Sequence, residues 1–393
     1  MASKYNKSNS SLTEYPDKLG CYRVNGLKFY SKLEAIEVHS KTGIHPHWDF
    51  NEAVFKSYDW TKEPETSLQE LYQQRAQQLR EKYDYIVLMF SGGADSTNVL
   101  KTFINNDIKI DEVVSYMAYE SNRDKDAFFN AEIFRVGIPL AEQLKIEYPW
   151  LKHRVIDLTD FMAEHFKKKN NKFEWIYDMN SCFSPNNSCK ESLPLKIKEW
   201  ADIIHSGKKF CVLWAHDKPR IWHVDGKFLF RFIDVIDNAA TVKSIAGKQP
   251  YTDELFYWTP DLPEILIKQG HIIKQYLTQP NVEKLPFVSK IKSDLAFKQV
   301  NGVNYWLSNH GVHSLIYPGW NIKTFTNGKA SSAIFTERDS WFFNLSKTLD
   351  IRKNFFDGLD VLWQIIPDYW KNNPADIKEG IKGCWSRDYF LEK

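Results

Sequence analysis

Four short runs of apolar, strand-favouring residues recur in the middle of the chain, separated by segments with helical patterns. They occupy residues 85–90, 112–119, 153–158 and 209–216. A continuous apolar run is typical of a strand that is buried on both faces of a parallel sheet. Strands that alternate with helices predict βαβ units. We therefore expect an α/β/α domain with a parallel sheet over residues 81–245.

The segments between these runs carry helix signals. Residues 67–83 open with a capping-box pattern, in which a serine is followed three positions later by a glutamate. Residues 121–148 are long enough for a helix that breaks near Gly137. Residues 193–207 predict a shorter helix that is closed by Gly207. Helices are thus predicted on both sides of the glycine-rich turn described below.

The two flanks show different patterns. Residues 1–80 contain a predicted helix at 31–39 among Pro, Gly and Trp residues, and we expect them to form an N-terminal cap. Residues 221–233 consist of two extended apolar runs around an Asp-Gly pair, which predicts a β-hairpin. We expect residues 246–393 to form a mostly helical, aromatic-rich C-terminal region.

Composition describes an ordinary folded protein. Hydrophobic residues make up 43% and charged residues 26% of the 393 residues, as in average globular domains. The net charge of +2 lacks the basic excess of proteins that bind nucleic acid mainly through phosphates, although a local basic patch stays open. The aromatic fraction of 15% indicates first a large core and second a capacity to stack on bases or sugars.

Cysteine usage and hydropathy bear on the compartment. An odd number of cysteines in so long a chain argues for reduced thiols rather than a disulfide framework. No run of about 18 apolar residues and no signal-peptide pattern occurs. We therefore expect a cytoplasmic protein without a membrane partner. The five cysteines are Cys21, Cys182, Cys189, Cys211 and Cys384.

The segment with the clearest chemistry is SGGADST, directly after the first predicted strand and before a predicted helix. Glycines let a backbone approach an anion closely, and the first amides of a helix attract it. A carboxylate beside these groups would repel phosphate, so we expect Asp95 to hold Mg²⁺ or to cap the helix. Neither GxxxxGK[ST] nor GxGxxG occurs, which removes the best evidence for a P-loop NTPase or a dinucleotide oxidoreductase.

The segment resembles the SGGxDS signature of the PP-loop ATP pyrophosphatases, the adenine-nucleotide alpha-hydrolase-like group. This group includes the synthetase domains of asparagine synthetase and GMP synthetase and several tRNA-modifying enzymes. The resemblance covers residues 83–233 and implies that ATP and Mg²⁺ are bound at the loop, that a substrate oxygen attacks the α-phosphate, and that an amine or ammonia displaces AMP. The expected nucleotide-binding residues are Ser91, Gly92, Gly93, Ala94, Asp95, Ser96, Thr97 and Tyr119.

A second group of polar residues follows the fourth predicted strand. Ligands of open parallel sheets lie at the carboxyl ends of the strands, so this turn should face the glycine-rich loop. We expect Lys218 and Arg220 to clamp pyrophosphate and, with Asp95, to carry the catalysis. Asp217 is expected to be a second metal ligand. The layout is similar to that of asparagine synthetase, but the residues HDKPR do not match the motif of that enzyme.

Several alternatives stay open at the level of sequence. The acceptor could be a small molecule or a nucleobase, and in the latter case the protein would be a nucleic-acid base-modifying synthetase. Ala2 stands where glutamine-dependent relatives carry a catalytic cysteine, so nitrogen is expected from ammonia, an amine substrate or a separate donor protein. A PAPS reductase-like enzyme would use Cys384. A non-catalytic module that binds an adenine nucleotide is the remaining alternative.

Other clusters carry weaker signals. Cys182 and Cys189 are seven residues apart, which is not the spacing of a CxxC metal or redox site. His39, His45 and His47 form no HExxH motif, so we expect them to pack in a loop rather than to bind zinc.

Overall fold

A five-stranded parallel sheet forms the centre of the protein. The computed structural model describes residues 17–117, 119, 133–167, 176–177, 193–215, 219–234, 250–283, 313–318, 351–375 and 380–393. The strand order is β10-β7-β4-β5-β6, and every neighbouring pair is parallel. The strands are β4 (Tyr85–Met89), β5 (Glu112–Met117), β6 (His153–Asp157), β7 (Phe210–Trp214) and β10 (Thr252–Leu255). The four strands predicted from apolar runs are thereby confirmed.

Strand β10 lies in the region that was expected to be mostly helical. Its sequence, TDEL, contains two adjacent acidic residues in place of an apolar run, yet both are buried. Asp253 accepts a hydrogen bond from the Trp214 indole at 2.7 Å, and Glu254 accepts one from Arg75 at 2.9 Å. These partners come from distant parts of the chain, so the local pattern did not reveal the strand.

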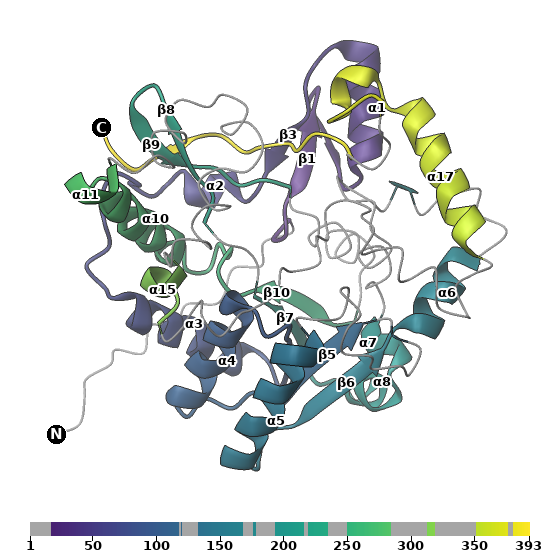
Figure 1. Ribbon diagram of the computed structural model, residues 1–393. Coiled ribbons are helices and arrows are strands. Elements are labelled where there is room, and N and C mark those ends of the chain that lie inside the picture. Colours follow the sequence, from purple (N-terminus) through teal and green to yellow (C-terminus); the bar gives the residue numbers. More distant parts are fainter. Residues whose placement is uncertain are drawn as a thin grey trace.

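Helices cover both faces of the sheet (Figure 1). Strand residues that pair in register share a face, so Glu254, Leu213 and His153 lie on one side, where Glu254 meets α3. The opposite face meets α8 through Trp200, whose indole donates to Glu112 at 2.7 Å. The covering helices are α3 (Leu68–Lys82), α4 (Ala94–Asn105) and α5 (Ile138–Glu147) on the first face and α7 (Leu193–Lys196) and α8 (Lys198–His205) on the second.

The predicted start of α3 is confirmed in detail. The Ser67 hydroxyl accepts from the Glu70 amide, and the Glu70 carboxylate accepts from the Ser67 amide, as in a complete capping box. The predicted break near Gly137 is also present, because a π-helix (Ile133–Gly137) precedes α5 there. The helix closed by Gly207 is divided into α7 and α8.

Two antiparallel sheets lie apart from the parallel sheet (Figure 1). The first has the order β2-β1-β3 and the second the order β11-β9-β8. In the second, Asp225 (φ 49°) and Gly226 (φ 80°) form the turn of the predicted hairpin; two positive φ values are what a type I′ turn requires. The strands are β1 (Cys21–Val24), β2 (Leu27–Phe29), β3 (His47–Asp49), β8 (Ile221–Val224), β9 (Lys227–Phe230) and β11 (Tyr389–Phe390).

The remaining helices connect distant parts of the chain. Near the N-terminal sheet lie α1 (Lys32–Thr42), which confirms the helix predicted at 31–39, and α2 (Glu52–Phe55). In the C-terminal region, α17 contacts α6, although the two helices are far apart in sequence (Figure 1). The other bounds are α6 (Thr159–Lys167), α10 (Glu264–Leu277), α11 (Pro280–Glu283), α15 (His313–Ile316), α17 (Ile351–Ile365) and a 3₁₀-helix (Asp368–Trp370).

A buried ion pair joins the N-terminal sheet to the C-terminus. The Lys32 ammonium lies 2.7 Å from the Asp234 carboxylate, and both side chains are fully buried. Asp234 also accepts from the Tyr22 hydroxyl at 2.9 Å and from the Cys384 amide at 2.7 Å. A buried charge is tolerated only when it is paired and hydrogen-bonded, so these four residues hold three chain segments in one arrangement.

Apolar and aromatic side chains form one continuous core that reaches from the N-terminal sheet to the last strand. Trp258 is 1% exposed, and Phe232 packs against Phe50 with ring centroids 4.6 Å apart. These buried aromatic residues agree with the first interpretation of the high aromatic content, which was a large core. None of the helices in the described ranges combines the length and apolar character needed to cross a membrane.

Candidate functional site

The carboxyl end of β4 is the point at which the strand order of the sheet reverses. From β4 the sheet grows to β5 and β6 on one side and to β7 and β10 on the other. At such a point the loops that follow neighbouring strands run to opposite sides of the sheet, and ligands bind in the crevice between these loops. The predicted loop Ser91–Gly93 joins β4 to α4. The structure therefore brings the glycine-rich segment to the reversal point of the sheet.

Gly92 and Gly93 shape the turn from β4 into α4. Gly92 has a φ of +80°, a conformation that L side chains rarely adopt. Gly93 is the N-cap residue of α4 with extended backbone, and no side chain caps the helix there. The amide groups of the first turn, which begins at Ala94, thus lie at the crevice with the positive end of the helix dipole. This backbone arrangement is favourable for an anion.

The three hydroxyl groups of the segment differ in accessibility. Ser91 is half-buried, and its Oγ accepts from the Gly93 amide at 3.3 Å. Ser96 is 3% exposed and donates to the Gly93 carbonyl at 3.3 Å. Thr97 is 5% exposed, and its Oγ1 has no hydrogen-bond partner within the described part of the chain. Ser91 is therefore the hydroxyl of this group best placed to meet a ligand.

The loop rests directly on the π-helix through a contact between two glycines. A Cβ added to Gly92 would lie 2.5 Å from the Cα of Gly137, and a Cβ added to Gly137 would lie 2.8 Å from the Ser91 carbonyl oxygen. Both distances are shorter than heavy atoms tolerate, so the two backbones can approach only because both residues are glycine. The sequence marked Gly137 as a helix break but not as a support of the loop.

We expect Gly92→Ala to destabilise the fold much more than Gly207→Ala. Both residues have positive φ, +80° and +82°, but an added Cβ meets nothing within 4 Å at Gly207. Each substitution should cost about 1 to 2 kcal/mol of unfolding free energy for the left-handed backbone. Gly92→Ala should cost about 1 to 3 kcal/mol more, because the clash is with backbone. Equal losses in urea unfolding would contradict the glycine contact.

Asp95 lies in the first turn of α4 and is 7% exposed. Its Oδ1 accepts from the Ser96 amide at 3.0 Å. Its backbone carbonyl accepts from the Tyr257 hydroxyl at 3.0 Å, and that hydroxyl accepts from the Asn98 side chain at 2.9 Å. Burial raises the pKa of Tyr257 well above its usual value, so the phenol remains a donor. Tyr257 follows the unpredicted strand β10, and sequence analysis missed its contact with the loop helix.

Tyr119 lies beyond the carboxyl end of β5, at the same edge of the sheet as the loop. Its amide donates to Asp157 Oδ1 at 3.1 Å, and its ring meets Phe134 of the π-helix edge-on, with centroids 5.3 Å apart. Asp157 ends β6 and also accepts from the amide and hydroxyl of Thr159. The π-helix thus contacts both Tyr119 and the glycine-rich loop. Asp157 was not predicted, although an acidic residue at a strand end was a visible signal.

The second predicted group is described only in part. Asp217 and Lys218 lie outside the described residues. Arg220 is half-buried between β7 and β8, and its carbonyl accepts from the Arg231 amide at 3.2 Å. The structure therefore brings Tyr119 and the loop to one edge of the sheet, while the position of the Lys218 side chain stays a prediction.

Of the cysteine and histidine clusters, the structure describes the histidines and Cys384. Burial raises the pKa of the Cys384 thiol to about 12, and Cys182 and Cys189 lie outside the described residues. His39 Nδ1 bonds to the Ile44 carbonyl at 2.9 Å. Across the described ranges, no group of three or more His, Cys, Asp or Glu side chains could hold a metal ion.

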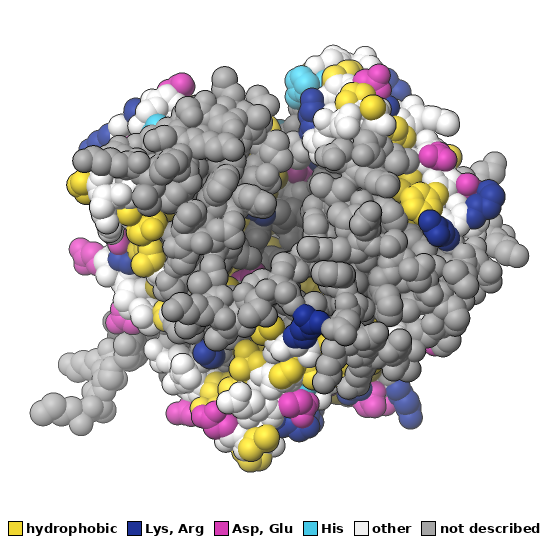
Figure 2. Space-filling view, viewed as in Figure 1, with side chains coloured by type: hydrophobic (Ala, Val, Ile, Leu, Met, Phe, Trp, Pro, Cys, Tyr) yellow, Lys and Arg dark blue, Asp and Glu magenta, His cyan; other side chains and the backbone are white. Residues whose placement is uncertain are grey.

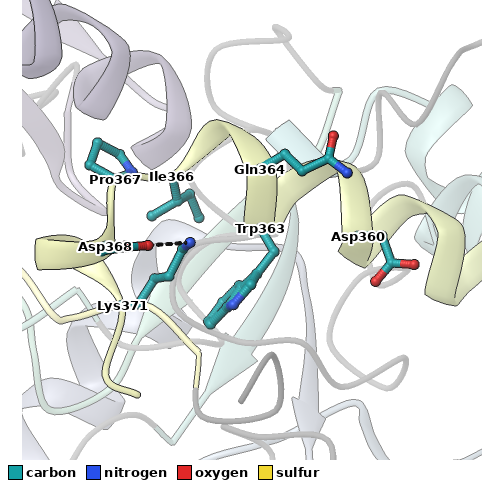
Figure 3. Close-up of a pocket in the computed structure, with 7 residues that line it drawn as sticks. All are labelled: Asp360, Trp363, Gln364, Ile366, Pro367, Asp368 and Lys371. Carbon is teal, nitrogen blue, oxygen red and sulfur yellow. Dashed lines mark hydrogen bonds and ion pairs between the residues drawn. The ribbon is translucent and has the colours of Figure 1, made fainter. Parts of the chain in front are cut away.

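A pocket of about 650 Å³ lies elsewhere, beside the C-terminal half of α17 (Figure 3). The Lys371 ammonium lies 2.7 Å from Asp368 and 5.3 Å from the centre of the Trp363 ring. The Lys371 ammonium therefore already interacts with a carboxylate and with an aromatic ring. None of the predicted site residues lines this pocket, whose lining is Asp360, Trp363, Gln364, Ile366, Pro367, Asp368 and Lys371.

Comparison with known proteins identifies no family. No protein-family model matches the chain, and no curated protein matches it significantly. The structure establishes an α/β protein with a parallel five-stranded sheet, two small antiparallel sheets and a helical C-terminal part.

Proposed function

We propose that the protein binds ATP at the Ser91–Thr97 segment and uses it to adenylate a substrate oxygen, with release of pyrophosphate. The observation that carries this proposal is the position of an SGGADS loop at the reversal point of the sheet. That position combines a positive-φ glycine, a helix N-terminus whose N-cap residue is a glycine, and a half-buried serine hydroxyl. Together these features favour a polyphosphate.

The proposed reaction has two steps. First, an oxygen of the acceptor forms a bond to the α-phosphorus, and the bond from that phosphorus to the bridging oxygen of pyrophosphate breaks. Second, an amine or ammonia forms a bond to the activated carbon, and AMP leaves with the oxygen. The work of the protein is to position the phosphates and to stabilise developing negative charge. The loop amides would serve the leaving pyrophosphate, and Lys218 and Arg220 would add positive charge.

The oxygen atoms that the loop offers as metal ligands suit a magnesium ion. Asp95 supplies carboxylate oxygens, one of which accepts from the Ser96 amide. Hard oxygen ligands are those that Mg²⁺ prefers. Asp217 is the second proposed ligand. A bound Mg²⁺ would supply charge neutralisation at the phosphates.

The net charge and the described side chains on one face favour a small acceptor over nucleic acid. On the face shown in Figure 2, basic and acidic side chains of the described residues are interspersed, and the net charge is only +2. A phosphate-binding surface for nucleic acid would be expected to concentrate basic residues. The reductase alternative loses support because Cys384 is 3% exposed with a raised pKa, whereas a nucleophilic cysteine needs an accessible thiolate.

The test is product analysis with α-labelled ATP and Mg²⁺, with and without a small-molecule extract. Formation of AMP and pyrophosphate is the expected result. Formation of ADP and orthophosphate would contradict adenylation. ATP binding without turnover in any extract would instead favour the non-catalytic module. Turnover that requires added tRNA or DNA would favour the base-modifying synthetase, and a salt-sensitive gel shift would then accompany it.

A further inference from the structure

Three side chains form a hydrogen-bonded chain that ends on the backbone carbonyl just before the glycine-rich loop. The Ser115 hydroxyl on β5 donates to the Phe90 carbonyl at 3.1 Å. Its Oγ also lies 3.2 Å from His153 Nε2 on β6, and His153 Nδ1 lies 2.7 Å from Glu142 Oε1 on α5. Phe90 directly precedes Ser91, so this chain connects α5 to the start of the loop.

The arrangement has the order of a Ser-His-carboxylate triad but not its accessibility. Ser115 is 0% exposed, and the His153 side chain is 0% exposed, whereas the Glu142 side chain is 49% exposed. The Ser115 hydroxyl faces a backbone carbonyl rather than a crevice. A nucleophile must reach its substrate, so the three residues are better explained as a support for Phe90.

The contacts of His153 tie α5 to the strand pair. The hydrogen bond from His153 is the main cause that lowers the pKa of Glu142 below its usual value. Glu142 is therefore a carboxylate, and His153 Nδ1 donates to it. The imidazole is thus held between Glu142 on α5 and the Ser115 hydroxyl on β5.

Removal of either polar side chain would release the carbonyl. Without the Ser115 hydroxyl, the Phe90 carbonyl loses the side-chain hydrogen bond that holds it. Without the His153 imidazole, the Ser115 hydroxyl loses the contact that links it to α5 through Glu142. Glu142 also interacts with Lys145, 3.5 Å away on α5.

We propose that Glu142, His153 and Ser115 are positioning residues for the nucleotide loop. Glu142 orients His153, His153 contacts the Ser115 hydroxyl, and that hydroxyl holds the Phe90 carbonyl at the start of the loop. Loss of this hydroxyl or of the His153 imidazole therefore weakens ATP binding. This inference rests on the proposed function for its ligand, but the coupling from His153 to the loop exists without ligand.

The first experiment compares the Ser91 amide by NMR in the ligand-free wild type and its variants. The Ser91 nitrogen is bonded to the Phe90 carbonyl carbon, so its shift reports the hydrogen bond to that carbonyl. We expect the shift to change in the same direction in Ser115→Ala and in His153→Gln. His205→Gln, at an exposed histidine of α8, is the matched control and should keep the wild-type shift. A Ser91 shift that is unchanged in Ser115→Ala and in His153→Gln overturns the proposal.

The second experiment measures the dissociation constant of ATP for the same proteins. We expect Ser115→Ala to weaken binding about three- to tenfold, His153→Gln to weaken it in the same direction, and the control to bind as the wild type does. Wild-type affinity in both Ser115→Ala and His153→Gln contradicts the coupling. A wild type that does not bind ATP contradicts the proposed function alone, and the NMR result then decides whether the three residues hold the Phe90 carbonyl. If His153→Gln does not fold, Glu142→Gln replaces it.

Discussion

Asp95→Asn is expected to reduce AMP-forming turnover of ATP about 100-fold or more while the fold is retained. The substitution removes one negative charge from the phosphate site, and loss of one preorganised electrostatic group in an active site has an effect of about this size. The Asn side-chain oxygen can still accept from the Ser96 amide, which Asp95 Oδ1 bonds at 3.0 Å. The unfolding free energy should therefore fall by no more than about 1 kcal/mol, the value of a carboxylate near a helix N-terminus.

The measurement is the initial rate of pyrophosphate release, with circular dichroism and urea unfolding of the same samples. Asp225→Asn is the control, since Asp225 lies exposed in the β8–β9 turn with positive φ, which asparagine also adopts. The control should retain the wild-type rate. Full activity in Asp95→Asn would contradict a role for this carboxylate at the phosphates.

Glu254→Gln is expected to cost about 3 to 5 kcal/mol of unfolding free energy, because it leaves buried cations without their shared anion. Glu254 is 0% exposed and lies 2.9 Å from Arg75 and 3.0 Å from Lys82, and it also pairs with Lys18. Asp261 would remain as the one other acidic partner that the described residues provide to Arg75 and Lys18. Urea unfolding at neutral pH measures the loss.

Glu164→Gln is the matched control for this substitution. Glu164 makes an ion pair with Lys196 at 3.4 Å, but its side chain is 67% exposed. Exposed pairs contribute little, so we expect a change within about 0.5 kcal/mol. A loss in Glu254→Gln no larger than that of the control would contradict the stabilising role of the buried cluster.

The same cluster predicts a dependence of stability on pH. Although burial opposes it, the pKa of Glu254 lies far below its usual value of 4.5, because Lys18, Arg75 and Lys82 favour the carboxylate. A group with a depressed pKa contributes stability above its unfolded-state value and loses it as the pH falls. The difference between wild type and Glu254→Gln should therefore be full at pH 7 and shrink below about pH 4.5. A difference that is constant down to pH 2 would contradict this.

Local sequence was sufficient for elements whose signal lies within a few residues. The Ser67 capping box, the buried strand Tyr85–Met89 and the Asp225 turn all appear as predicted. Each depends on short-range hydrogen bonding or on the apolar character of consecutive residues. The loop at Gly92 was found for the same reason, since a glycine pair between a strand and a helix is a local pattern.

Local sequence was insufficient where the position of a residue depends on a partner that is distant along the chain. Strand β10 was missed because Asp253 and Glu254 resemble surface residues until Trp214 and Arg75 are brought beside them. The support of Phe90 by Ser115 was missed because it needs the register of β5 against β4. Periodicity and composition carry no information about such pairings.

The sequence by itself determined the parallel α/β architecture and the place of the glycine-rich loop between a strand and a helix, because apolar runs and turn residues act locally. Only the tertiary structure decided what surrounds that loop: Gly137 at its backbone, Tyr257 at the first turn of α4, and the chain of hydrogen bonds that reaches the Phe90 carbonyl through Ser115. These contacts join segments that are far apart along the chain or on different elements. Their geometry is set by strand order and close packing, which exist only once the sheet has formed.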